Sequence, residues 1–166
     1  MRKLGAGRPG GVLVLGLGLL PLLLQPDPSA SAQAVKPSAK DKCPVCGMFV
    51  SGFPDFLAQI VFKDGFRAYF DGPKDMFRYY FEPEKYHPGR KTGDIASVHV
   101  TDYYSLEMID GRQAFYISGS DVLGPMGNEL VPVGRKDQAR TFLDDHKGKS
   151  LLKFNEITLE IVNHLD

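Results

Sequence analysis

The residues best suited to chemistry are three sulfur side chains close together in the segment Cys43-Pro44-Val45-Cys46-Gly47-Met48. Thiolates and thioethers are soft donors, which suit Cu(I) better than Mg²⁺, Ca²⁺ or Mn²⁺. Gly47 frees the backbone to turn tightly, so that Cys46 and Met48 can reach one ion. The segment therefore predicts a site for a soft metal ion, with Cys43, Cys46 and Met48 as candidate ligands.

A further sulfur atom, that of Met126, lies far along the chain in the sequence Gly124-Pro125-Met126-Gly127. The surrounding residues 118–133 are rich in glycine and proline, which favours a loop. The neighbours of Met126 are small, so its thioether has few local packing partners. If this loop folds back, Met126 adds a thioether to the same ion, and it is a candidate ligand on that ground.

Three other interpretations of the cysteine pair stay open at this point. Cys43 and Cys46 can form a redox-active pair in a thiol-disulfide oxidoreductase, although no clear strand precedes them and no helical pattern follows. A structural zinc ion needs four ligands, two of which would have to be histidines. A disulfide with no further role would close only a very small loop and stabilise the fold little.

The remaining candidate residues give weaker signals. The four histidines, His87, His99, His146 and His164, show no metal-ligand spacing. His99 lies in an apolar stretch, where a structural role is the better interpretation. Met76 and Met108 fall within helix and hairpin patterns and are expected in the core.

The N-terminal residues have the composition of a secretory signal peptide. Arg2, Lys3 and Arg8 precede an apolar run, Val12–Leu24, and Ala30-Ser31-Ala32 forms a cleavage site of the A-x-A type. We therefore expect residues 1–32 to be removed after Ala32 and the protein to be exported to the periplasm. The alternative is an uncleaved segment that associates with the membrane, but the run is shorter than the roughly 20 residues of a spanning helix.

The overall composition excludes two classes of protein. The chain has 166 residues with no formal net charge, so it lacks the basic excess of a general nucleic-acid binder. It is 43% hydrophobic and 24% charged, which excludes a chain that is disordered throughout. After a flexible leader at 33–42, we expect one domain over residues 43–166.

A short internal repeat predicts how that domain is built. Asp64-Gly65 and Asp110-Gly111 each follow an apolar stretch and precede an aromatic run, which predicts hairpins at about 56–71 and 103–118. Each hairpin precedes a helical pattern, which begins near Pro73 in one copy and spans Lys136–His146 in the other. Strands are expected to follow at Ile95–Val100 and Leu151–Val162. The fold class is thus α+β, with duplicated ββαβ units over about 43–101 and 102–166.

Taken together, the motifs resemble the NosL family, exported copper-binding accessory proteins of nitrous oxide reductase maturation. The resemblance rests on Cys-Pro-Val-Cys-Gly-Met at 43–48, on Gly-Pro-Met-Gly-x-Glu-Leu at 124–130, and on the helix with Phe142 and His146. It implies a duplicated ββαβ fold related to the core of organomercurial lyase. It also implies a protein without catalytic activity.

The resemblance further implies one Cu(I) ion per chain, passed on to the copper-sulfide centre of nitrous oxide reductase. Cys46 and Met48 match the family's Cys-Gly-Met ligands, and Met126 matches the methionine of the loop. Cys43 matches the first cysteine of the pair, whose role is open. Many members are lipoproteins, but here the A-x-A site has no lipid-attachment cysteine beside it.

Overall fold

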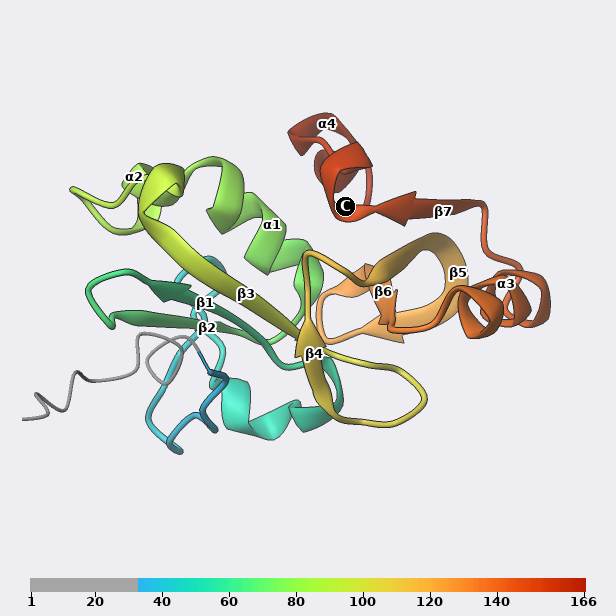
Figure 1. Ribbon diagram of the computed structural model, residues 1–166, viewed down its shortest axis with the longest axis horizontal. Coiled ribbons are helices and arrows are strands. Elements are labelled where there is room, and N and C mark those ends of the chain that lie inside the picture. Colours follow the sequence, from blue (N-terminus) through green and yellow to red (C-terminus); the bar gives the residue numbers. More distant parts are fainter. Residues whose placement is uncertain (1–32) are drawn as a thin grey trace, which may run out of the picture.

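The computed structural model describes residues 33–166 (Figure 1). The predicted signal peptide falls on residues 1–32 and lies outside the described residues. Within residues 33–166, no helix combines the length and the apolar character needed to cross a membrane.

The first part of the described chain forms a four-stranded antiparallel sheet with the strand order β2-β1-β3-β4. Its strands are β1 (Ala58–Phe62), β2 (Arg67–Phe70), β3 (Ile95–Thr101) and β4 (Met108–Asp110). Two helices, α1 (Pro73–Phe81) and α2 (Pro83–Tyr86), connect β2 to β3. Short 3-10 turns lie at Val50–Gly52, Pro54–Phe56 and Thr92–Asp94.

Helix α1 packs its apolar side onto this sheet. Met76 and Phe77 are fully buried, and the ring of Tyr79 lies against Phe62 and Phe70 of the strands. Pro73 occupies the first turn, where its missing N–H leaves no helical bond unmade. The helix therefore begins immediately after β2, and its N-terminal end is held at the edge of the core.

The second part of the chain forms a three-stranded antiparallel sheet with the order β6-β5-β7. It consists of β5 (Phe115–Gly124), β6 (Gly127–Val133) and β7 (Ser150–Lys153), with helix α3 (Lys136–Asp145) between β6 and β7. A 3-10 turn at Phe154–Glu156 leads to the last helix, α4 (Leu159–Asn163). Phe142 of α3 is buried against Phe115, Ile117, Val131 and Val133 of this sheet, which gives it a small core of its own.

The predicted fold class is confirmed: the structure mixes helices with antiparallel sheets (Figure 1). In both sheets the first strand lies between the second and the third, and a helix joins the second strand to the third. The prediction that Asp110-Gly111 forms a second hairpin like the first is nevertheless wrong. Asp64-Gly65 does join the paired strands β1 and β2, but Asp110-Gly111 lies between β4 and β5, which belong to different sheets.

Gly111 explains why the second Asp-Gly does not form a hairpin. Gly65 has a φ of +87°, which suits a tight turn, whereas Gly111 is not among the residues with positive φ. A Cβ at Gly111 would lie 2.9 Å from Val98 and 3.1 Å from the Tyr116 hydroxyl. This glycine therefore allows a close approach between chain segments rather than a turn.

Two further expectations are corrected. Residues 118–133, predicted as a loop, form most of the β5–β6 hairpin, because an irregularity between Ser118 and Leu123 accommodates the polar stretch within the ladder. The strand expected at 151–162 ends at Lys153. The side chain of Thr158 accepts a hydrogen bond from the Ile161 N–H, so a helix begins there instead.

The segment predicted as a flexible leader makes specific contacts with the first sheet. The Val35 N–H donates to the side chain of Gln59 at 3.0 Å, and the Gln59 amide donates back to the Val35 carbonyl at 3.1 Å. Arg67 donates to the carbonyl of Gln33. The polypeptide thus reaches the cysteine segment along the side of β1 and β2.

Candidate metal centre

The cysteine segment folds into a tight turn. The Cys43 N–H donates to the Met48 carbonyl and the Gly47 N–H donates to the Cys43 carbonyl, both at 2.9 Å. Gly47 has a φ of +82°, a conformation that favours glycine, as the sequence predicted. The two cysteines, which are not linked by a disulfide, project from one compact loop.

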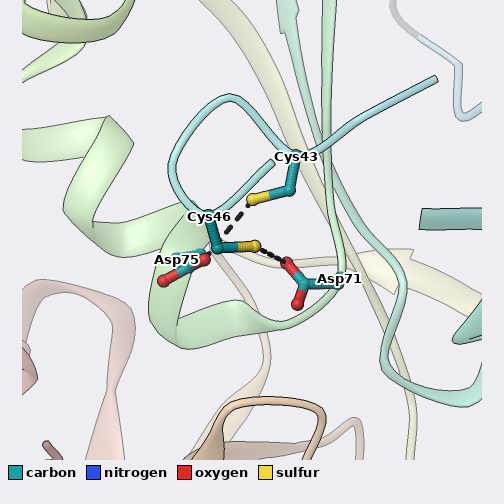
Figure 2. Close-up of side chains that lie close together, drawn as sticks. All are labelled: Cys43, Cys46, Asp71 and Asp75. Carbon is teal, nitrogen blue, oxygen red and sulfur yellow. Dashed lines mark hydrogen bonds between the residues drawn. The ribbon is translucent and has the colours of Figure 1, made fainter. Parts of the chain in front are cut away.

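Two carboxylates complete a group of four side chains, shown in Figure 2. The ligand atoms of Cys43, Cys46, Asp71 and Asp75 all lie within 4.8 Å of one another. Cys46 Sγ donates to Asp71 Oδ1 at 3.2 Å, and Cys43 Sγ donates to Asp75 Oδ2 at 3.4 Å. We call these four residues the cysteine–aspartate centre. Among residues 33–166, no other grouping of three or more His, Cys, Asp and Glu side chains is close enough to hold a metal ion.

The aspartates were not predicted from the sequence as site residues. Asp71 follows the last residue of β2, and Asp75 lies in the first turn of α1. That they face the cysteines is a tertiary contact, for which the local sequence gives no signal.

The centre is largely withdrawn from solvent. Cys43 is 1% exposed, the two aspartates are buried, and Cys46 is half-buried. Oδ2 of Asp71 is buried and has no hydrogen-bond partner among the described residues. A buried carboxylate oxygen without a donor is costly, which fits a centre that takes up a cation. Cys46, the more accessible thiol, marks the side from which an ion can enter.

Burial and the neighbouring carboxylates keep both thiols in the protonated form. Burial raises the pKa of Cys46 to about 12, and the hydrogen bond to Asp71 adds to the rise. Burial, followed by the charges of Asp75 and Asp71, raises the pKa of Cys43 still further. A metal ion that binds these sulfur atoms must therefore displace their protons.

The two methionines lie on different elements. Met48 closes the cysteine turn through its backbone carbonyl and is half-buried. Met126 forms the two-residue turn between β5 and β6 with Pro125, and its side chain is 44% exposed. The Lys74 ammonium donates to the Met126 carbonyl at 2.7 Å, so this turn lies beside the end of α1 that carries Asp75. That the thioethers bind metal stays a prediction.

No histidine joins the two cysteines in the described part of the chain, so the structure does not support a zinc site built from cysteine and histidine. His87 bonds to the Tyr79 hydroxyl, His146 to Asp121, and His164 to the carbonyl of Glu160. His99 bonds to Ser97 within β3. None of the four belongs to the cysteine–aspartate centre.

Comparison with known proteins assigns the chain to a family. The sequence matches the family model for NosL over residues 34–162, which is most of the chain. The chain belongs to the NosL family. The match includes the cysteine turn, both aspartates and the Met126 turn.

Individual NosL proteins are similar over long stretches. The copper-binding lipoprotein NosL of Stutzerimonas stutzeri is 28% identical over 163 residues, which span 95% of this chain and 82% of that protein. The crystal structure of the copper chaperone NosL from Shewanella denitrificans has a TM-score of 0.66 and 25% identity, covering 78% of this chain and 98% of that one. The solution structure of apo-NosL from Achromobacter cycloclastes has a TM-score of 0.46 and 26% identity, covering 63% and 87%.

Proposed function

We propose that this protein is a Cu(I)-binding metallochaperone, which carries one copper ion per chain as cargo and catalyses no reaction. The observation that carries the proposal is the convergence of Cys43 and Cys46 in one partly buried centre. The similar NosL proteins are named as a copper-binding lipoprotein and a copper chaperone, which supports copper as the metal. Soft sulfur ligands favour the monovalent ion.

Cys46 is the proposed primary ligand, because it is the more accessible of the two thiols. Met48, two residues further along the same turn, supplies a thioether, and Met126 supplies another from the second sheet. Cys43 lies deeper and is the proposed fourth candidate. A site with few, soft ligands leaves room for a sulfur or nitrogen ligand of an acceptor, so copper can pass by stepwise ligand exchange.

Loading requires a defined proton transfer. When Cu(I) binds Cys46, the S–H bond breaks, the sulfur keeps the electron pair and forms the Cu–S bond, and the proton leaves. Asp71 Oδ1 already accepts a hydrogen bond from Cys46 Sγ at 3.2 Å, so it is placed to receive the proton. Release to an acceptor reverses the sequence, since the thiolate is reprotonated as copper departs.

For the acceptor and the compartment, support comes from the family alone. We propose delivery to nitrous oxide reductase, for assembly of its copper-sulfide centre, because the sequence motifs resemble accessory proteins of that enzyme. The Stutzerimonas stutzeri relative is named a lipoprotein, which supports an exported, envelope-associated protein. We propose the periplasm as the compartment. Incubation of the Cu(I)-loaded protein with copper-free reductase, followed by metal analysis of both, tests the transfer.

The thiol chemistry argues against the alternative of a thiol-disulfide oxidoreductase. Such enzymes need an attacking thiolate at neutral pH, which is usually obtained by lowering the cysteine pKa. Here burial raises the pKa of Cys46 to about 12, and the neighbouring carboxylates oppose ionisation. Reduction of a model disulfide with catalytic turnover would reinstate the alternative.

An anaerobic titration with a chromophoric Cu(I) competitor tests the function. The wild-type chain should bind one equivalent, Cys46→Ser should lose most of its affinity, and Met48→Leu and Met126→Leu should each bind measurably less tightly. Met76→Leu is the matched control, because Met76 is fully buried in the core below α1. Unchanged stoichiometry and affinity in Cys46→Ser would refute the proposed site.

A further inference from the structure

A buried carboxylate outside the cysteine–aspartate centre links the two sheets. Glu129 lies on β6 and is 3% exposed. Its Oε1 accepts the backbone N–H of Lys74, in the first turn of α1, at 2.6 Å. The same oxygen accepts the N–H of Leu130 on its own strand at 2.8 Å. One side chain of the second sheet is thereby bonded to the helix turn that also carries Asp75.

Two glycines enclose this carboxylate. A Cβ at Gly72, between Asp71 and α1, would collide with Oε2 of Glu129. A Cβ at Gly124, at the end of β5, would lie 2.9 Å from the same oxygen. Gly124 is two residues before Met126. The Glu129 carboxylate thus fits between the segment that presents Asp71 and the hairpin that presents Met126.

Lys74 adds a second link between the same two segments. Its side chain is 2% exposed, and its ammonium donates to the Met126 carbonyl at 2.7 Å. It also lies 3.6 Å from Asp166, near the end of the chain. The Met126 turn is therefore bonded to α1 in two ways. Its own carbonyl accepts from the Lys74 ammonium, and Glu129 on the adjoining strand accepts from the Lys74 backbone N–H.

We propose that Glu129, together with Lys74, is a positioning device that holds the Met126 turn against the start of α1 and so delivers the Met126 thioether to copper. This role rests on the proposed function. It assigns to Glu129 an effect on the metal that passes through Met126, without contact with the ion. Residues that orient metal ligands typically change metal affinity 10- to 100-fold when they are removed.

The test is a double-mutant cycle of Cu(I) affinity between positions 129 and 126. Glu129→Ala should weaken Cu(I) binding by about 10- to 100-fold in the wild-type background. In the Met126→Leu background the same substitution should change the affinity by less than about threefold, because the thioether it positions is gone. Glu129→Gln keeps an oxygen that can accept both N–H groups and should restore binding. Lys74→Leu removes the ammonium but keeps the backbone N–H that Glu129 accepts, so it should show a smaller loss that also disappears in Met126→Leu.

Two controls separate positioning from general stability. Val133→Ala removes buried volume from the same strand but faces the core around Phe142, and it should leave Cu(I) affinity unchanged. In the copper-free protein, amide hydrogen exchange at Gly124, Met126 and Gly127 should accelerate in Glu129→Ala and not in Val133→Ala. Equal losses of affinity in both backgrounds, an equal loss in Val133→Ala, or unchanged exchange would overturn the inference. Absence of copper binding by the wild-type chain would instead overturn the proposed function, and the role of Glu129 would fall with it.

Discussion

The central residues of this protein are two thiols that each face a carboxylate. Cys43 donates to Asp75 and Cys46 to Asp71, and burial together with these charges favours the neutral thiols. Oxidation proceeds through the thiolate, so a protonated pair resists it. This property suits the proposed copper carrier, whose two close cysteines would have to stay reduced until the metal binds.

The pairing predicts a defined effect of Asp71→Asn. Loss of the carboxylate removes a negative charge beside the sulfur, so the pKa of Cys46 should fall from about 12. Alkylation by iodoacetamide should therefore become faster at neutral pH. The rate is best measured in the Cys43→Ser background, where one thiol remains. Asp137→Asn is the matched control, because Asp137 is an exposed partner of Arg135. A slower or unchanged rate in Asp71→Asn would contradict the described pairing.

At the scale of elements, local patterns were sufficient where short-range chemistry decides the structure. The hairpin around Asp64-Gly65 and the helices beginning at Pro73 and Lys136 were predicted because turn residues and apolar spacing specify them. The Asp110-Gly111 segment was misassigned because strand pairing depends on partners far along the chain. Asp71 and Asp75 were missed for the same reason, since they join the site only when α1 packs beside the cysteine turn.

The two Asp-Gly segments can be distinguished experimentally by substituting asparagine for each glycine. Asparagine tolerates the left-handed conformation, and Gly65 has open space where a side chain would begin, so Gly65→Asn should change the free energy of unfolding by less than about 1 kcal/mol. Gly111→Asn places atoms against Val98 and Tyr116 and should cost about 1–3 kcal/mol. Chemical denaturation measures both. A cost at Gly111 as small as that at Gly65 would contradict the close approach described for Gly111.

The junction between β6 and α1 should give the fold a characteristic pH dependence. Burial raises the pKa of Glu129 to about 8 from its ordinary value of 4.5, so the folded state binds more protons than the unfolded state between these values. The free energy of unfolding should therefore fall as the pH rises from 5 to 8. One unit of pKa shift corresponds to about 1.4 kcal/mol, so a loss of at least that size is expected from Glu129.

Glu129→Gln isolates this contribution, because glutamine does not titrate. The unfolding free energy of the wild type minus that of Glu129→Gln should be larger at pH 5 than at pH 8. Denaturant titrations at pH 5 and pH 8 measure it. A difference that stays constant between the two pH values would show that the carboxyl group ionises normally in the folded protein.

At the scale of the whole molecule, the proposed ligands come from both sheets. Cys43, Cys46 and Met48 precede the first sheet, whereas Met126 forms the turn of the β5–β6 hairpin in the second (Figure 1). The larger hydrophobic core contains buried residues of both sheets, and the contacts of Glu129 and Lys74 add polar links between the halves near the cysteine–aspartate centre. Copper binding at this place would join the halves through one ion.

The most direct measurement is X-ray absorption at the copper edge of the protein loaded anaerobically with one equivalent of Cu(I). The account predicts an inner shell of sulfur atoms, with one sulfur fewer in Met126→Leu and in Met48→Leu, and loss of the bound copper in Cys46→Ser. A shell made mainly of oxygen or nitrogen in the wild-type protein, left unchanged by all three substitutions, would contradict it.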